Sequence, residues 1–132
     1  MKYLWFNSFL ILFATCLVII CNFEKSSIIN VYYASNLYIC NINKDPSITS
    51  PNIIIKKVIG THISMSHKNV EGFYSDSISF KIHYIPHGVH NFFPKFVLIY
   101  INNGRVKEIH QNDLVNYPKL KYLDLDENDS SN

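Results

Sequence analysis

Hydrophobic residues are concentrated in an almost unbroken run at the start of the chain. Lys2 is followed by an apolar segment from Tyr3 to Ile20 that only three polar residues interrupt. A basic residue before the run and small residues at Ala14 and Cys16 near its end are typical of a secretory signal peptide. The pattern therefore predicts a secreted, extracellular protein.

The position of the cleavage site decides how many cysteines remain. We expect the leader to occupy residues 1–20, with cleavage after Cys16 or at the latest after Cys21. Cleavage after Cys16 leaves Cys21 and Cys40 as an even pair, which in a secreted chain predicts a disulfide, whereas cleavage after Cys21 leaves Cys40 alone. An apolar run of this length can also just span a bilayer, so an uncleaved anchor is the alternative and the one case in which the chain would contact a membrane.

Beyond the leader, shorter apolar runs predict strands rather than helices. Residues 23–43 alternate loosely around a polar turn and predict a β-hairpin, and the apolar run 53–59 predicts a further strand. Residues 61–69 are polar and predict a loop, whereas residues 78–82 alternate as in a half-buried strand. Helix is expected to be limited to a turn or two near residues 111–116.

The C-terminal part of the chain aligns with itself at a fixed offset. The offset places the segment 93–96 on 117–120, and apolar positions fall on apolar positions throughout. The matched pairs include Ile85 with Ile109, Ile99 with Leu123, Ile101 with Leu125 and Asn102 with Asp126. A fixed period in the twenties is typical of a solenoid unit.

The second copy has the spacing L-x-x-L-x-L-x-x-N of a leucine-rich repeat, from Leu120 to Asn128. The first copy begins at Phe96 and has Gly104 in place of the asparagine. This spacing predicts a short parallel strand in each copy, with alternate side chains pointing into a solenoid and the Asn side chain bound to backbone groups at the bend. The predicted repeat core consists of Phe96, Ile99, Ile101, Val106, Ile109, Leu114, Leu120, Leu123, Leu125 and Asn128.

Residues between these core positions are expected to point to the opposite, concave face of the strands, because side chains alternate along a strand. The candidate ligand-facing residues are Tyr100, Asn102, Tyr122, Asp124 and Asp126. Aromatic side chains supply contact area in recognition surfaces, and charged side chains supply selectivity. This combination predicts a surface that binds a protein or a glycan.

The order of several motifs resembles the N-terminal part of secreted insect leucine-rich-repeat proteins, over residues 21–128. The motifs are Cys21…Tyr38-x-Cys40, Val58-Ile59-Gly60-Thr61-His62, Ile85-Pro86-x-Gly88-Val89-x-x-Phe92-Phe93-Pro94 and Asp113-Leu114-x-x-Tyr117-Pro118-x-Leu120-x-x-Leu123-x-Leu125-x-x-Asn128. The resemblance implies an extracellular protein-binding solenoid that opens with a disulfide-bearing cap. Members of the family normally continue through more repeats, so we expect either a fragment or short isoform, or a chain whose binding surface is much reduced.

Together these features predict a mainly β chain with little helix. An antiparallel N-terminal β cap is expected over residues 21–83, and a parallel-strand leucine-rich-repeat solenoid of about two 24-residue repeats over residues 84–128. Residues 129–132 are expected to form a frayed acidic tail. A β-sandwich whose strands fall at the same spacing is the alternative.

The charge distribution narrows the choice of partner. The 132 residues include 12 basic and 10 acidic side chains, giving a net charge of +2. No basic cluster is present in the sequence, which argues against a nucleic-acid-binding protein. Asn128 begins the one N-glycosylation sequence, Asn-Asp-Ser.

Histidines are the remaining candidates for chemistry. His83, His87 and His90 lie close together, but no cysteine or nearby carboxylate completes a tetrahedral set, so we predict no metal site. His62 and His67 could form an acid–base pair. Because no nucleophile motif or glycine-rich phosphate loop accompanies them, we predict no enzymatic activity and no cofactor.

The sequence thus predicts a secreted leucine-rich-repeat recognition module that binds a protein or glycan through its concave face. The alternative is a structural or assembly protein. In that case the last strand, Leu120–Leu125, would pair with another chain, because an edge strand has one unpaired side.

Overall fold

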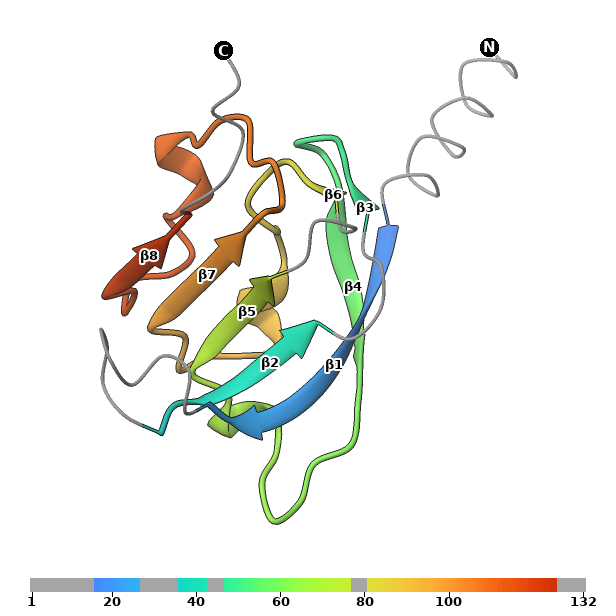
Figure 1. Cartoon of the computed structure of the whole chain (residues 1–132), viewed down its shortest axis with the longest axis vertical. Helices are drawn as coiled ribbons and strands as arrows, with labels where there is room; N and C mark the ends of the chain where they lie inside the picture. The colour runs from blue at the N-terminus through green and yellow to red at the C-terminus, as the bar shows by residue number, and fades with distance from the viewer. Residues whose placement is uncertain (1–15, 27–35, 43–46, 77–80, 126–132) are drawn as a thin grey trace, which may run out of the picture.

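The structure, a computed structural model, describes residues 16–26, 36–42, 47–76 and 81–125 (Figure 1). The strands within these ranges are β1 (Cys16–Lys25), β2 (Tyr38–Ile42), β3 (Ser47–Ile48), β4 (Ile54–Ile59), β5 (Gly72–Asp76), β6 (Lys81–Ile82), β7 (Leu98–Asn102) and β8 (Tyr122–Asp124). The helical segments are three short 3-10 turns, η2 (His67–Asn69), η3 (Val89–Asn91) and η4 (Gln111–Asp113). The predicted mainly β class with little helix is therefore confirmed.

Six of these strands form one mixed sheet, in the order β4-β1-β2-β5-β7-β8, and β3 and β6 form a second, two-stranded sheet. In Figure 1 the arrows of β2, β5, β7 and β8 point the same way, and β1 runs against β2. Within the described residues, β1 and β2 are the one antiparallel pair, and every other pair of strands is parallel. The prediction of an antiparallel cap over residues 21–83 was therefore wrong for most of that range.

The antiparallel partner of β2 also differs from the predicted one. β2 pairs with β1, in the register Phe23 opposite Cys40. The hairpin predicted within residues 23–43 required residues 29–33 to pair with β2, and these lie outside the described residues. β1 can take this place because the half that pairs with β2 alternates: Cys21 and Phe23 pack in the main core, whereas Asn22 and Glu24 are exposed. β1 also pairs with β4 along its other edge.

β1 begins within the apolar run that the sequence assigned to a leader and continues beyond it to Lys25. Ile19 is 1% exposed and Cys21 is 3% exposed, so this strand contributes side chains to the core. The predicted boundary at residue 20 lies inside β1, and residues 1–15 lie outside the described range. In the described part of the chain, no helix is long and apolar enough to cross a membrane.

The predicted disulfide between Cys21 and Cys40 is present. It joins neighbouring strands, β1 and β2, with the two Cα atoms 5.1 Å apart. Both cysteines are buried in the main core, so the bond links the antiparallel end of the sheet to the rest of the fold.

The strands β2, β5, β7 and β8 follow one another in the sheet in the order in which they occur in the chain. β7 and β8 pair with Ile99 opposite Leu123, which is the offset found in the sequence. β5 and β7 pair with Phe73 opposite Ile99, at a slightly longer spacing. The segments that connect the strands lie side by side as well, because the amide of Ile82 donates to Gly104 and the amide of Lys107 donates to His83.

The main core lies between the inner face of the six-stranded sheet and these connecting segments. Of the predicted repeat core, Phe96, Ile99, Ile101 and Val106 are buried, and Leu114, Leu120 and Leu125 are half-buried against the same cluster. Asn128 lies outside the described residues. These contacts fix the inner face of β7 and thereby direct the alternate residues of β7 and its neighbours outward.

Two predicted core residues are exposed instead. Ile109 is 40% exposed because residues 107–112 all lie at the surface, and the inward positions beside them are taken by Val106 and Asp113. Leu123 is 39% exposed because β8 is the last described strand of the sheet, so a neighbouring strand covers it from one side only.

Candidate functional site

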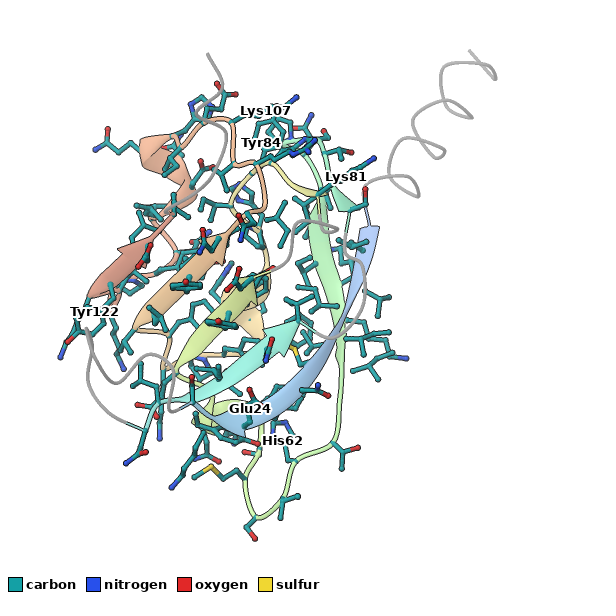
Figure 2. The ribbon with its side chains drawn as sticks, viewed as in Figure 1. Glu24, His62, Lys81, Tyr84, Lys107 and Tyr122 are labelled. Carbon is teal, nitrogen blue, oxygen red and sulfur yellow. A yellow bond between two sulfur atoms is a disulfide. The ribbon has the colours of Figure 1, made fainter. Side chains whose placement is uncertain are left out.

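The outer face of the parallel strands carries three tyrosines and a row of polar side chains. β5, β7 and β8 direct Phe73, Ile99 and Leu123 inward, so the residues between them point outward. We name this surface the tyrosine face and define it by Tyr74, Asp76, Tyr100, Asn102, Tyr122 and Asp124. Figure 2 labels Tyr122 on β8, at one edge of the sheet, and Glu24 on β1, toward the other edge.

Parallel register brings the tyrosines of β5 and β7 into contact. Tyr74 lies opposite Tyr100, and their rings stack with centroids 4.7 Å apart and an interplanar angle of 11°. On β8, Tyr122 lies opposite Leu98 and packs against the same apolar cluster as Tyr100. Stacked aromatic pairs on adjacent strands are rigid, so this face presents its rings in a fixed arrangement.

Hydrogen bonds connect the polar residues above the rings. Asn102 Nδ2 donates to Tyr100 Oη at 3.2 Å, and Asn103 Nδ2 donates to Asp76 Oδ1 at 2.9 Å. Tyr74 Oη donates to Asp76 Oδ2 at 3.5 Å. The row therefore couples β5 to β7 at the end of the strands and orients the hydroxyl groups of both tyrosines.

A smaller apolar cluster supports the other end of the face. Its buried members are Leu37, Ile39, Tyr74 and Leu98, and Val97, Tyr100 and Tyr122 pack against it. Because Leu98 is fully buried, the tyrosines rest on a packed base, and their rings expose only part of their surface. The tyrosine face thus has a packed apolar cluster beneath its rings and a row of hydrogen-bonded polar side chains at one end.

The charged side chains on the outer face of these strands are all negative. The outward positions of β2, β5, β7 and β8 include the carboxylates Asp76 and Asp124 and no Lys or Arg. Glu24 on β1 adds a third carboxylate, and its Oε1 accepts a hydrogen bond from Asn41 Nδ2 at 3.0 Å. Burial, and after it the neighbouring charge of Asp76, raises the pKa of Tyr74 to about 12.

The structure brings together four of the five residues that the sequence selected as ligand-facing. Tyr100, Asn102, Tyr122 and Asp124 are all half-buried on the tyrosine face, and Asp126 lies outside the described residues. Sequence reasoning missed Tyr74 and Asp76, which β5 contributes. A slightly longer offset than that of the sequence repeat would have aligned Tyr74 with Tyr100 and Asp76 with Asn102.

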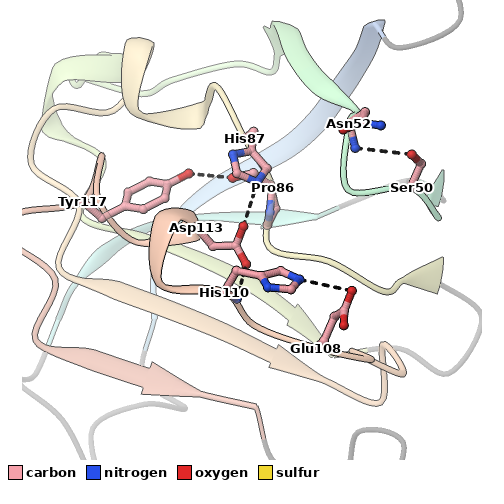
Figure 3. Close-up of polar contacts among 8 residues, drawn as sticks. All are labelled: Ser50, Asn52, Pro86, His87, Glu108, His110, Asp113 and Tyr117. Atoms are coloured by element: carbon pink, nitrogen blue, oxygen red, sulfur yellow. Dashed lines mark hydrogen bonds and ion pairs between the residues drawn. The ribbon is translucent and has the colours of Figure 1, made fainter.

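A second polar cluster lies among the connecting segments (Figure 3). His87 Nε2 lies 3.0 Å from Asp113 Oδ1, and the other oxygen of this carboxylate accepts the backbone amide of His110. Tyr117 Oη donates to the carbonyl of Pro86 at 2.7 Å, and burial beside Asp113 raises the pKa of Tyr117. These contacts tie the segment after β6 to the segment after β7, so we assign them a structural role.

The histidines near this cluster do not assemble a metal centre. His87 uses a ring nitrogen on Asp113, and His90 forms an edge contact with the ring of Tyr117. In the part of the chain that the structure describes, no group of three or more potential ligands could hold a metal ion.

Comparisons with known proteins add no functional assignment. No protein-family model matches the chain, and no curated protein and no solved structure is significantly similar to it. The function is therefore argued from the geometry of the tyrosine face.

Proposed function

We propose that the chain is a secreted recognition module of the leucine-rich-repeat type, which binds a protein or a glycan through the tyrosine face. The observation that carries the proposal is that three successive parallel strands each direct a tyrosine and a polar side chain outward, with Tyr74 opposite Tyr100 and Tyr100 opposite Asp124. Each of these residues is held by its neighbours on the sheet, so a ligand would meet a preformed surface.

The repeat interpretation is supported by three features of the backbone. The strands pair in parallel in chain order, β7 and β8 pair at the offset of the sequence repeat, and the connecting segments also hydrogen-bond to one another. In a solenoid each unit contacts its neighbours in this way. The resemblance to secreted leucine-rich-repeat proteins agrees with this arrangement.

Secretion is supported by the leader pattern together with the disulfide, since such bonds persist in oxidising compartments. We propose cleavage after Cys16. This position retains β1 from Leu17 onward, including its pairing with β4, and it retains Cys21. Cleavage after Cys21 would remove one partner of the disulfide and the buried side chain of Ile19.

A protein or glycan ligand fits the chemistry of the face. Tyrosine rings give large, rigid contact area with a polar hydroxyl group, which suits both sugar rings and protein surfaces. A specific protein interface buries about 800 Å² on each partner. Three strands, with Asp76 exposed on β5 beside the half-buried Tyr100 and Tyr122, provide a broader surface than the two repeats recognised in the sequence.

The proposal is tested with printed glycans and a panel of purified extracellular protein domains. For a ligand found in this way, we expect the double substitution Tyr100→Ala and Tyr122→Ala to weaken binding about 30-fold, which corresponds to about 2 kcal/mol. Surface plasmon resonance gives the affinities.

Two controls separate binding from folding. Tyr100→Phe keeps the ring stacked on Tyr74 and should preserve most of the affinity, whereas Lys95→Ala changes an exposed residue away from the face. Equal affinity of the double variant and the native protein for every ligand found would refute the assignment of this face.

Self-association is a second candidate function, favoured by one observation. β8 is at the end of the described sheet, and Leu123 is 39% exposed there. An edge strand with an exposed apolar residue can pair with a second chain.

A further inference from the structure

Three polar side chains form a continuous hydrogen-bonded chain on the inner side of the sheet, away from the tyrosine face. Tyr38 Oη lies 2.7 Å from His62 Nδ1, and His62 Nε2 lies 2.7 Å from His67 Nδ1. Tyr38 belongs to β2, His62 follows β4, and His67 begins η2. The contacts thus connect the sheet to a loop whose polar sequence does not predict packing against it.

Aromatic packing holds both imidazoles in this position. The ring of His62 stacks on Phe23 of β1 with centroids 3.8 Å apart, and His67 makes an edge contact with Phe93 at 5.6 Å. Just before His62, a Cβ atom on Gly60 would lie 2.5 Å from the carbonyl oxygen of Cys21. The loop therefore enters this site in close contact with β1.

The rest of the loop is mostly at the surface. Ile63 is 86% exposed, Met65 is 36% exposed, and Ser64 has a φ of 62°. Because these residues bury little surface, the order of the loop depends strongly on the contacts of His62 and His67.

The distance between the two imidazoles fits a hydrogen bond rather than a bridging metal ion. Their ring centroids are 4.9 Å apart and their facing nitrogens 2.7 Å apart, so the rings meet nearly end to end. A zinc ion in line between them would need about 4 Å between the nitrogens, twice the usual Zn–N bond length. A hydrogen bond needs about 2.7–3.2 Å, which this contact provides.

The hydrogen bond between the two imidazoles can be kept when the pair gains one proton but not when it gains a second. With one or no extra proton on the pair, one of the facing nitrogens still has a lone pair that accepts the hydrogen of the other. When both imidazoles are protonated, both facing nitrogens carry a hydrogen, and two positive charges are placed in contact. Burial, and the neighbouring charge of His67, accordingly lower the pKa of His62.

The charged groups around the pair do not offset that repulsion. Glu24 and Lys25 of β1 both line the cavity of about 350 Å³ that Tyr38 also lines, so their opposite charges offset each other, and Lys68 follows His67 in η2. Both nearby carboxylates are engaged in hydrogen bonds: Glu71 accepts the backbone amide of Tyr38 at 3.2 Å, and Glu24 accepts Asn41 Nδ2 at 3.0 Å. The phenol of Tyr38 is the remaining titratable group in contact, and burial raises its pKa.

We propose that the Tyr38–His62–His67 chain is a pH-sensitive latch, which holds the loop between Gly60 and Val70 against β1 and β2 at neutral pH and releases it in acid. The sign follows from linkage: the closed loop favours the neutral form of His62, and the open loop binds more protons. The closed state is therefore stable above the ordinary histidine pKa of about 6.5 and is lost as the pH falls below it. Release uncovers the face of the Phe23 ring on which His62 stacks.

The test is backbone NMR relaxation of the disulfide-bonded protein at about pH 7.5 and about pH 5.0. Order parameters of residues 61–66 are expected to fall from about 0.85 to below about 0.6 on acidification, while those of Ile99 and Ile101 in β7 stay unchanged. His67→Gln keeps an acceptor for His62 without a charge, so its loop should stay ordered at both pH values. His110→Gln, at an exposed histidine, should respond like the native protein.

Three outcomes would overturn the proposal. The native loop could stay rigid at the lower pH, the loop of His67→Gln could open like the native one, or β7 could lose order together with the loop. Ring ¹⁵N titration of the native protein is independent of any variant. The two histidines are expected to titrate in two separated steps, and titration of both in a single step near pH 6.5 would contradict a shared proton.

Discussion

At the scale of single residues, the tyrosine face combines ring stacking with negative charge. Tyr74 is buried beside Asp76 and Tyr100, and a phenolate at this position would lie next to a carboxylate in a poorly solvated site. These surroundings keep the hydroxyl group protonated, so Tyr74 remains a hydrogen-bond donor at physiological pH. The same surroundings make the fold sensitive to alkali.

Tyr74→Phe is expected to reduce the loss of stability in alkali. The folded pKa of Tyr74 is about 12 and the ordinary value is about 10, so its contribution is fully present below about pH 10 and is lost as the pH rises through 12. We expect the native protein to lose about 1–2 kcal/mol more than the variant between about pH 8 and about pH 12. Urea denaturation at the two pH values measures this difference.

Tyr84→Phe is the matched control, because Tyr84 packs against the main core and not on the tyrosine face. Between the same two pH values, Tyr84→Phe should lose as much free energy of unfolding as the native protein. If Tyr74→Phe loses as much free energy of unfolding in alkali as the native protein does, the assigned environment of Tyr74 is contradicted.

At the scale of elements, strands could be predicted from the sequence where the local spacing of apolar residues matches the pattern of burial. The strand predicted at 53–59 is β4, and the offset of the sequence repeat anticipates the pairing of β7 with β8. Both elements contain regularly spaced apolar residues, which local pattern detects.

β1 and β5 were harder to predict, for different reasons. The apolar run from Tyr3 to Ile20 has no alternation, so residues 16–20, with which β1 begins, could not be distinguished from a leader. β5 has the short sequence Gly-Phe-Tyr-Ser-Asp, and its inward positions are Phe73 and the polar Ser75, which is buried opposite Ile101, so apolar and polar residues do not alternate along it. Missing β5 also removed Tyr74 and Asp76 from the predicted site.

The disulfide between β1 and β2 is expected to stabilise the fold by about 3 kcal/mol, the chain-entropy value for a loop of this size. The double substitution Cys21→Ser and Cys40→Ser should lower the free energy of unfolding by that amount in urea denaturation. Reductant should destabilise the native protein to a similar degree and leave the double variant unchanged. A cost below about 1 kcal/mol would mean that β1 is held by its strand pairing alone.

At the scale of the whole molecule, the six-stranded sheet has two edges, β4 and β8, within the described residues. The proposed recognition through the tyrosine face and the proposed assembly through β8 would use adjoining surfaces, because Tyr122 and Asp124 of β8 belong to the face. The two proposals can nevertheless be tested separately. Leu123 points to the inner side of the sheet, between these two residues, and its substitution leaves every side chain of the tyrosine face in place.

Leu123→Lys therefore tests assembly without altering the proposed binding surface. If β8 pairs with a second chain, light scattering of the native protein should show a dimer whose fraction rises with concentration. The variant should be monomeric, because a charged residue at a sheet edge opposes pairing. The exposed position of Leu123 limits the cost of the substitution to stability, which urea denaturation checks. A native protein that is monomeric at all concentrations would exclude assembly. A glycan or protein ligand that binds Leu123→Lys with native affinity would show that recognition does not require pairing through β8.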